Sequence, residues 1–143
     1  QVTNKVEMLL RVAWNMPNIF EYFVDSNPEL RAARDRLFGF SREPTQQEKM
    51  ELGRMFERIL SGDREALTEK VEKVLLKYCY DVKRNKCSRE NDVMKLACLV
   101  GRDSDKDFEN AILKAASLFD ENCSFDYNGP WPPYNFVEMK IKL

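Results

Sequence analysis

Histidine is absent from the 143 residues of this chain, and glycine is scarce, with five residues. Without histidine, the Ser-His-Asp and Cys-His mechanisms of nucleophilic catalysis are excluded, and a general base would have to be a carboxylate, a lysine or a tyrosine. The glycines are isolated from one another, so the sequence lacks the glycine-rich loop that cradles phosphate groups. We therefore expect a protein that binds rather than catalyses.

The chain also lacks an excess of charge of one sign and a long hydrophobic run. Lys and Arg number 23, Asp and Glu number 24, and the two signs alternate without forming blocks. This pattern provides no basic face for nucleic acid, and no apolar run approaches the ~18 residues of a membrane span. Neither nucleic acid nor a membrane is expected as a partner. At this length and 43% apolar composition, residues 1–143 are expected to fold as a single domain.

The four cysteines all lie in the second half of the chain: Cys79, Cys87, Cys98 and Cys123. An even number of cysteines in a short chain that starts at Gln1 instead of Met favours a processed, secreted protein with two disulfides. The alternative is four buried thiols in a cytosolic protein, because free cysteine packs as a small hydrophobe. A zinc site would need all four thiolates and has no C-x-x-C spacing, so no metal or other cofactor is predicted.

Apolar residues keep a helical spacing through most of the first 119 residues, between recognisable start and stop signals. Asn27 before Pro28 is an N-cap followed by proline at the first helical position. Thr45 to Glu48 form a capping box, the strongest start signal in the chain, and Ser61-Gly62 is expected to end that helix. The helices predicted from these signals cover residues 2–14, 19–24, 28–38, 45–60, 63–79, 88–101 and 104–118.

The composition changes after Asp120, where Gly129 and three prolines exclude helix between Ser124 and Tyr134. From Val137 onward apolar and charged residues alternate strictly, which is the periodicity of a strand, but no second strand is evident to pair with it. Docking of this arm on the helices is favoured, because terminal segments are commonly tied down. The alternative is an edge offered to a partner, with contacts expected from Trp131, Tyr134 and Met139. The fold class predicted is therefore all-α: a compact domain of six or seven disulfide-linked helices with an extended C-terminal arm, residues 120–143.

Aromatic residues are numerous for a small helical domain, with nine Phe, five Tyr and two Trp. Each one is most simply ordinary core, but together they allow an apolar pocket between helices. The residues predicted to line such a pocket are Trp14, Phe20, Phe23, Phe56, Tyr78, Phe108 and Ile112.

The segment from Cys79 through Ala97-Cys98-Leu99-Val100 to Asp107-Phe108-Glu109-Asn110-Ala111 carries a family resemblance. It resembles the closing helices of the insect odorant-binding superfamily, and most of all its mosquito salivary branch, the D-seven proteins. The resemblance implies disulfides between Cys79 and Cys98 and between Cys87 and Cys123. Leu113 and Ala116 stand where the amine-binding members carry a carboxylate pair, which implies that biogenic amines are not bound.

This resemblance implies a secreted, non-enzymatic, odorant-binding-like salivary protein that acts as a monomer. It would sequester an apolar small molecule or modulate host haemostasis or inflammation. Two other functions stay open at the level of sequence. One is an immune modulator that binds a host protein and has no ligand pocket, and the other is a cytosolic helical adaptor with free thiols.

Overall fold

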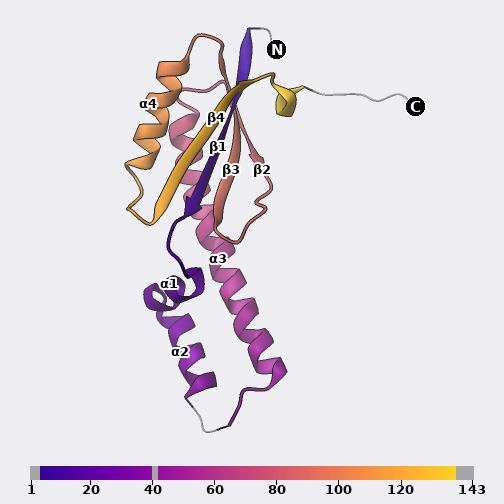
Figure 1. Ribbon diagram of the computed structural model, residues 1–143, viewed down its shortest axis with the longest axis vertical. Helices are drawn as coiled ribbons and strands as arrows, with labels where there is room; N and C mark the ends of the chain where they lie inside the picture. The colour runs from indigo at the N-terminus through magenta and orange to yellow at the C-terminus, as the bar shows by residue number, and fades with distance from the viewer. Residues whose placement is uncertain (1–3, 40–41, 138–143) are drawn as a thin grey trace, which may run out of the picture. The chain divides into compact units, whose positions relative to one another are not determined.

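The computed structural model describes residues 4–39 and 42–137 of the chain. These residues form two compact units, one from residues 1–15 together with 67–143, and the other from residues 16–66. The elements, in chain order (Figure 1), are β1 (Lys5–Trp14), α1 (Ile19–Ser26), α2 (Pro28–Phe38), α3 (Gln46–Leu75), β2 (Asp81–Asn85), β3 (Asp92–Gly101), α4 (Asp105–Ala116), β4 (Cys123–Trp131) and the 3-10 helix η1 (Tyr134–Phe136).

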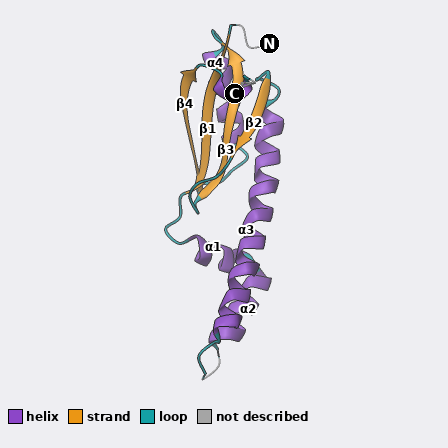
Figure 2. Cartoon of the chain, turned by 90° about the vertical axis from the view of Figure 1, so that its right-hand side faces the viewer, coloured by secondary structure: helices purple, strands orange, loops and turns teal. Residues whose placement is uncertain are grey.

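A four-stranded sheet forms the centre of the first unit, in the order β2-β3-β1-β4 (Figure 2). All neighbouring strands are antiparallel, and β1 pairs with β3 on one side and with β4 on the other. Leu10 of β1 lies opposite Leu96 of β3 and opposite Tyr127 of β4. The chain order of this unit, strand–helix–strand–strand–helix–strand, is that of a split βαβ arrangement, with α1 and α2 following the first strand.

One face of the sheet packs against α4 and the end of α3. On α4 the inward residues Phe108 and Ala111 are almost completely buried, and the Phe108 ring meets the Tyr127 ring of β4 at 5.5 Å between centroids. From α3, Glu72 forms an ion pair of 2.7 Å with Arg84 of β2. Because Tyr127 and Arg84 belong to the two border strands, these contacts show that helices cover this face from one border to the other.

The second unit consists of α1, α2 and the start of α3. The Phe56 ring of α3 meets the rings of Phe20 and Phe23 edge to face, at 5.2 and 6.1 Å between centroids. Leu30 and Ala33 of α2 are buried in the same unit. No helix among the described residues is long and apolar enough to cross a membrane.

The caps of two helices are confirmed. The Asn27 side chain accepts a hydrogen bond of 3.1 Å from the Leu30 N–H at the start of α2. At the start of α3, the Glu48 N–H donates to Thr45 Oγ1 at 3.1 Å and the Thr45 N–H donates back to the Glu48 carboxylate at 2.9 Å. Hydrogen bonds from Arg42 and then from Thr45 lower the pKa of Glu48 to about 2, so this cap is charged over most of the pH range.

The all-α fold class is wrong, because the segments predicted as helices over residues 2–14 and 88–101 contain the central strands β1 and β3. Both carry apolar residues at almost every position: β1 runs from Val6 to Trp14 with few polar interruptions, and β3 is buried from Asp92 to Val100 apart from Lys95. A strand buried on both faces shows no period of two, so its pattern resembles that of a buried helix.

Two further boundaries are corrected. Ser61-Gly62 does not end a helix, since α3 continues as one helix from Gln46 to Leu75. A helical glycine costs only about 1 kcal/mol, which buried residues such as Leu60 and Val71 offset. The predicted arm, residues 120–143, contains a strand that was not expected, because β4 pairs with β1. The strand that was predicted from Val137 onward falls almost entirely on residues that the structure does not describe. Residues 138–143, with the predicted contact residue Met139, lie outside the described residues.

A buried carboxylate fixes the turn between β2 and β3. Asp92 is 0% exposed and accepts a hydrogen bond of 2.6 Å from Arg11 Nε of β1, and others from the backbone N–H groups of Ser88 and Arg89 at 3.0 and 2.9 Å. Burial alone would raise the pKa of Asp92, but the hydrogen bonds from Arg89, Arg11 and Ser88 together hold it below its ordinary value of 3.8. The charged form is therefore the one that stabilises the fold.

Replacing Asp92 with asparagine should lower the free energy of unfolding by about 2 kcal/mol at neutral pH, since a charged hydrogen-bond acceptor is lost. Because the folded pKa lies below 3.8, this contribution is complete above that pH and disappears as the pH falls through the lower folded value. The stability difference between wild type and Asp92→Asn should thus narrow in acid, as measured by urea unfolding at a series of pH values. The exposed Asp103→Asn serves as the control, and a difference independent of pH would contradict the prediction.

Candidate functional site

Exposed aromatic side chains gather on β4 and the residues that follow it. We call residues 125–134 the aromatic segment. Tyr127 and Trp131 of β4 are 42% and 46% exposed, and Tyr134 of η1 is 72% exposed. β4 forms one border of the sheet, so this segment lies where another molecule has access to it (Figure 1). Large exposed aromatic side chains are typical of binding surfaces.

The end of the aromatic segment is fixed by a clamp on Asn135. The Glu7 carboxylate of β1, in a residue only 2% exposed, accepts hydrogen bonds from the Asn135 N–H at 2.9 Å and from its side-chain amide at 2.8 Å. Lys83 of β2 donates to the Asn135 carbonyl at 2.8 Å and lies 5.1 Å from the centre of the Phe136 ring. Glu7 lies opposite Leu99 in β3, whereas the helix-facing Met8 lies opposite Cys98, so η1 covers the sheet face that the helices leave open.

A glycine allows β4 to approach β1 at this end of the sheet. Gly129 has a φ of +131°, and a Cβ there would come within 2.9 Å of both the Glu7 carbonyl oxygen and Met8 Sδ. The register between β1 and β4 shifts at this point, so that Trp131 lies opposite Glu7. The Trp131 indole N–H then donates to the Asn128 side chain at 2.6 Å, which fixes the orientation of the ring.

Removing the amide of Asn135 should loosen the aromatic segment. The Asn135→Ala variant leaves a buried carboxylate short of a donor, so we expect a loss of about 1–3 kcal/mol in unfolding free energy and faster chymotrypsin cleavage after Trp131 or Tyr134. Urea unfolding and limited proteolysis measure the two effects. Asn110→Ala, at an exposed position of α4 outside the segment, is the control, and equal stability of the two variants would contradict the role of the clamp.

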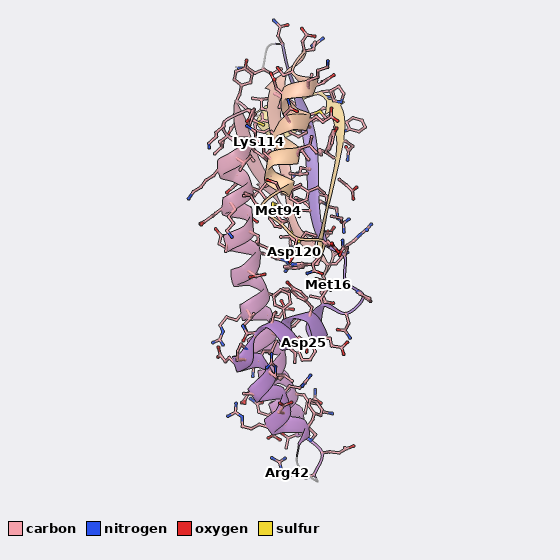
Figure 3. All side chains as sticks on the ribbon, turned by 90° about the vertical axis from the view of Figure 1, so that its left-hand side faces the viewer. Met16, Asp25, Arg42, Met94, Lys114 and Asp120 are labelled. Atoms are coloured by element: carbon pink, nitrogen blue, oxygen red, sulfur yellow. The ribbon has the colours of Figure 1, made fainter. Side chains whose placement is uncertain are left out.

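The residues predicted to line a single pocket fall into the two units. Phe20, Phe23 and Phe56 form the ring cluster of the second unit. The other four belong to the first unit: Trp14, Tyr78, Phe108 and Ile112. Of these, Tyr78 accepts a hydrogen bond from Lys114 on the exposed side of α4 (Figure 3), and the remaining three are buried.

A cavity of about 290 Å³ lies between α2 and α3 in the second unit. Its lining is mixed, with Arg36, Glu48 and Glu51 beside apolar side chains such as Leu52 and Met55. None of the seven predicted pocket residues lines it. Leu113, which was aligned with a carboxylate of the amine-binding proteins, is 63% exposed on the outside of α4.

The predicted disulfides are wrong, because Cys79, Cys87, Cys98 and Cys123 are all thiols. Cys79 and Cys98 do lie next to each other, and their two buried thiols form a hydrogen bond. This hydrogen bond, together with burial, raises the pKa of Cys98 above its ordinary value, so the thiol stays protonated at neutral pH. It packs as a small apolar side chain between the strands and the helices.

Thiol titration should therefore count four thiols in the denatured protein without added reductant. In the folded protein Cys98, which is 0% exposed, should react only on unfolding, whereas the partly exposed Cys87 should react early. Cys98→Ala is the control, and it should reduce the denatured count by one and leave the early phase unchanged. A denatured count of zero or two would contradict the thiol assignment.

Two residues of the site were not predicted from the sequence, and both are polar residues in apolar surroundings. Glu7 is a single acid within the apolar run of β1, and Asn135 lies among aromatic residues and prolines. A lone acid in a buried strand needs a partner, which would have drawn attention to Glu7. Within residues 4–39 and 42–137, no three Cys, Asp or Glu side chains come together as metal ligands.

Comparison with known proteins gives consistent matches. Residues 1–138 match the family model "Gas vesicle synthesis protein GvpL/GvpF". Gas vesicle protein F of Haloferax mediterranei is 39% identical over 49 residues, which are 34% of this chain and 23% of that protein. The crystal structure of gas vesicle protein GvpF from Anabaena sp. PCC7120 superposes with a TM-score of 0.82 at 19% identity, over 98% of this chain and 57% of that one. For GvpF from Microcystis aeruginosa the TM-score is 0.74 at 17% identity, over 96% and 56% of the two chains.

These matches correct the earlier interpretation. The chain spans slightly more than half the length of the two solved structures, and they show that its fold is theirs. The resemblance to odorant-binding and salivary D-seven proteins is wrong, and so is the host-directed function that it implied, because the family model covers nearly the whole chain. The secreted localisation expected from the cysteines is wrong for the same reason. The chain belongs to the gas vesicle synthesis protein GvpL/GvpF family.

Proposed function

We propose that the chain is a non-enzymatic component of gas vesicle synthesis that binds another gas vesicle protein through the aromatic segment. The family gives the process, and the observation that carries the choice of surface is the exposure of Tyr127, Trp131 and Tyr134 on one clamped segment. A protein that works in assembly must recognise other proteins, and aromatic side chains contribute large contact area at low cost in side-chain entropy.

The rigidity of the segment supports this proposal. Its end is clamped by the contacts of Asn135 with Glu7 and Lys83, and its indole ring is oriented by Asn128. A preorganised surface loses little conformational freedom when a partner binds. By contrast, the two most buried carboxylates described above, Glu7 and Asp92, are fully engaged in structural hydrogen bonds, which is the chemistry of a scaffold rather than of a general base.

The proposal is tested by replacing Trp131 and Tyr134 together with alanine. In a gas-vesicle-forming host that lacks its own copy of the gene, the double variant should fold but yield far fewer vesicles, as counted by electron microscopy and by buoyancy. Tyr80→Ala is the matched control, because Tyr80 is an aromatic residue of the same unit with 66% exposure that lies outside the segment. Normal vesicle numbers in the double variant, with unchanged expression, would overturn the proposal.

A further inference from the structure

β4 has a neighbouring strand on one side only. The sheet order places β1 beside it, and among the described residues no strand pairs with its other side. A border strand of this kind presents a row of N–H and C=O groups that another extended chain can pair with. At nine residues, β4 is long enough to accept such a strand.

The direction of these backbone groups follows from the pairing with β1. The Asn15 N–H donates to the Asn122 carbonyl at 2.8 Å, so Asn122 and every second residue after it point their backbone groups toward β1. The backbone N–H and C=O of Asp126 therefore point toward β1, where Asp126 lies opposite Arg11. The backbone groups of Phe125 and Tyr127 consequently point away from the sheet, along its free border.

The other border of the sheet, β2, is shorter and more basic than β4. β2 is five residues long and carries Lys83 and Arg84, both engaged with neighbouring parts of the same unit. Short length and basic side chains are common means of preventing strand addition. β4 has one charged residue, Asp126, in nine. Pro130 and the register shift at Gly129 limit the end of β4 in the same way, so strand addition is opposed at β2 and left open over residues 123–128 of β4.

Side chains beside the free border define the chemistry of an added strand. Phe125 and Tyr127 lie on the helix-covered face, where their rings meet Phe119 and Phe108 at 5.1 and 5.5 Å between centroids. Tyr127 remains 42% exposed at the border. A residue directly opposite either ring on an added strand would contact aromatic surface, so an apolar side chain fits both positions.

Asp126 lies on the opposite face of the sheet. Its neighbour across the strand pair is Arg11, but that guanidinium is bound to Asp92 at 2.6 Å. Within the described part of the chain, Asp126 forms no ion pair. A carboxylate at the border of a sheet is stabilised by a basic side chain directly opposite on the next strand.

We infer that β4 is completed by an extended segment of the partner protein, added as a fifth strand with the pattern apolar–basic–apolar opposite Phe125, Asp126 and Tyr127. This inference rests on the proposed function and specifies its partner. The hydrogen bonds of the Phe125 and Tyr127 backbone give affinity, while Asp126 sets the register, because a shift by one residue would place the basic side chain on the aromatic face.

The test uses a soluble eight-residue peptide with a valine–lysine–valine centre flanked by threonine and serine, titrated into the isotope-labelled protein. The amide signals of Phe125 and Tyr127 should shift and gain protection from hydrogen exchange. Tyr127→Pro removes the outward N–H and should abolish binding, whereas the matched Tyr127→Ala keeps that N–H and should weaken binding only several-fold. Because the N–H points away from β1, both variants should retain the fold, which circular dichroism checks.

Asp126→Lys provides an independent readout. It should reduce binding of the lysine peptide at least tenfold and favour a peptide with glutamate at the central position. Equal binding by Tyr127→Pro and Tyr127→Ala, no protection of the two amides at millimolar peptide, or unchanged preference in Asp126→Lys would overturn the strand addition. A concentration-dependent dimer that Tyr127→Pro abolishes would overturn it too, by making a second copy the occupant.

The two proposals fail in different ways. If alanine at Trp131 and Tyr134 reduces vesicle formation while Tyr127→Pro behaves like Tyr127→Ala, the aromatic segment is the binding surface but β4 does not accept a strand. If the peptide binds as described and vesicle numbers do not depend on Trp131 and Tyr134, strand addition stands and the assembly role of the segment is wrong.

Discussion

The first unit depends on the burial of β1 between two other strands, with α4 and the end of α3 on one face of the sheet and η1 on the other. This strand pairs with β3 and β4 at once along most of its length, and seven of its ten residues are buried. Val12 and Leu10 face α4 and the end of α3, and Glu7 faces the turn of η1. Since β1 supplies contacts to each of these elements, its loss would expose all of them together, which is the basis of cooperative folding in a small unit.

Two carboxylates connect this central strand to chain segments that are distant in sequence. Asp92 reaches β1 through Arg11 and also holds the turn before β3, whereas Glu7 holds Asn135 after β4. Buried charges are costly unless hydrogen bonds satisfy them, and both carboxylates here accept at least two. Their net contribution to stability is modest, but they specify where two otherwise irregular segments lie, and one of these segments presents the aromatic surface.

The binding surface follows from the same arrangement. A four-stranded sheet has two borders, and the sequence of β2 protects one of them with charge while β4 presents aromatic residues at the other. Gly129 is the residue that makes this possible, because its positive φ lets β4 pass within contact of β1 before Trp131 turns to the open face. The exposed position of Tyr134 depends in turn on the clamp at Asn135.

Local signals in the sequence determined the parts of the structure that need only near neighbours. The caps at Asn27 and Thr45–Glu48, the apolar face of α4, and the absence of helix around residues 129–133 could all be predicted, because each depends on hydrogen bonds or steric limits within a few residues. Trp131 and Tyr134 were predicted as contact residues only for the alternative in which the arm is offered to a partner; the structure shows that both are exposed, and the contact itself stays a prediction.

Only the tertiary structure decided the rest. The apolar runs of β1 and β3 fit a buried helix as well as a central strand, and the choice between them depends on pairing partners some ninety residues away, such as Leu10 with Leu96. The pairing of β1 with β3 also buries Cys98, and the pairing of β1 with β4 leads the chain back to the point where Glu7 meets Asn135. Residue patterns report the burial of a side chain but not which surface buries it, and that is why the fold class and the clamp could not be derived from the sequence.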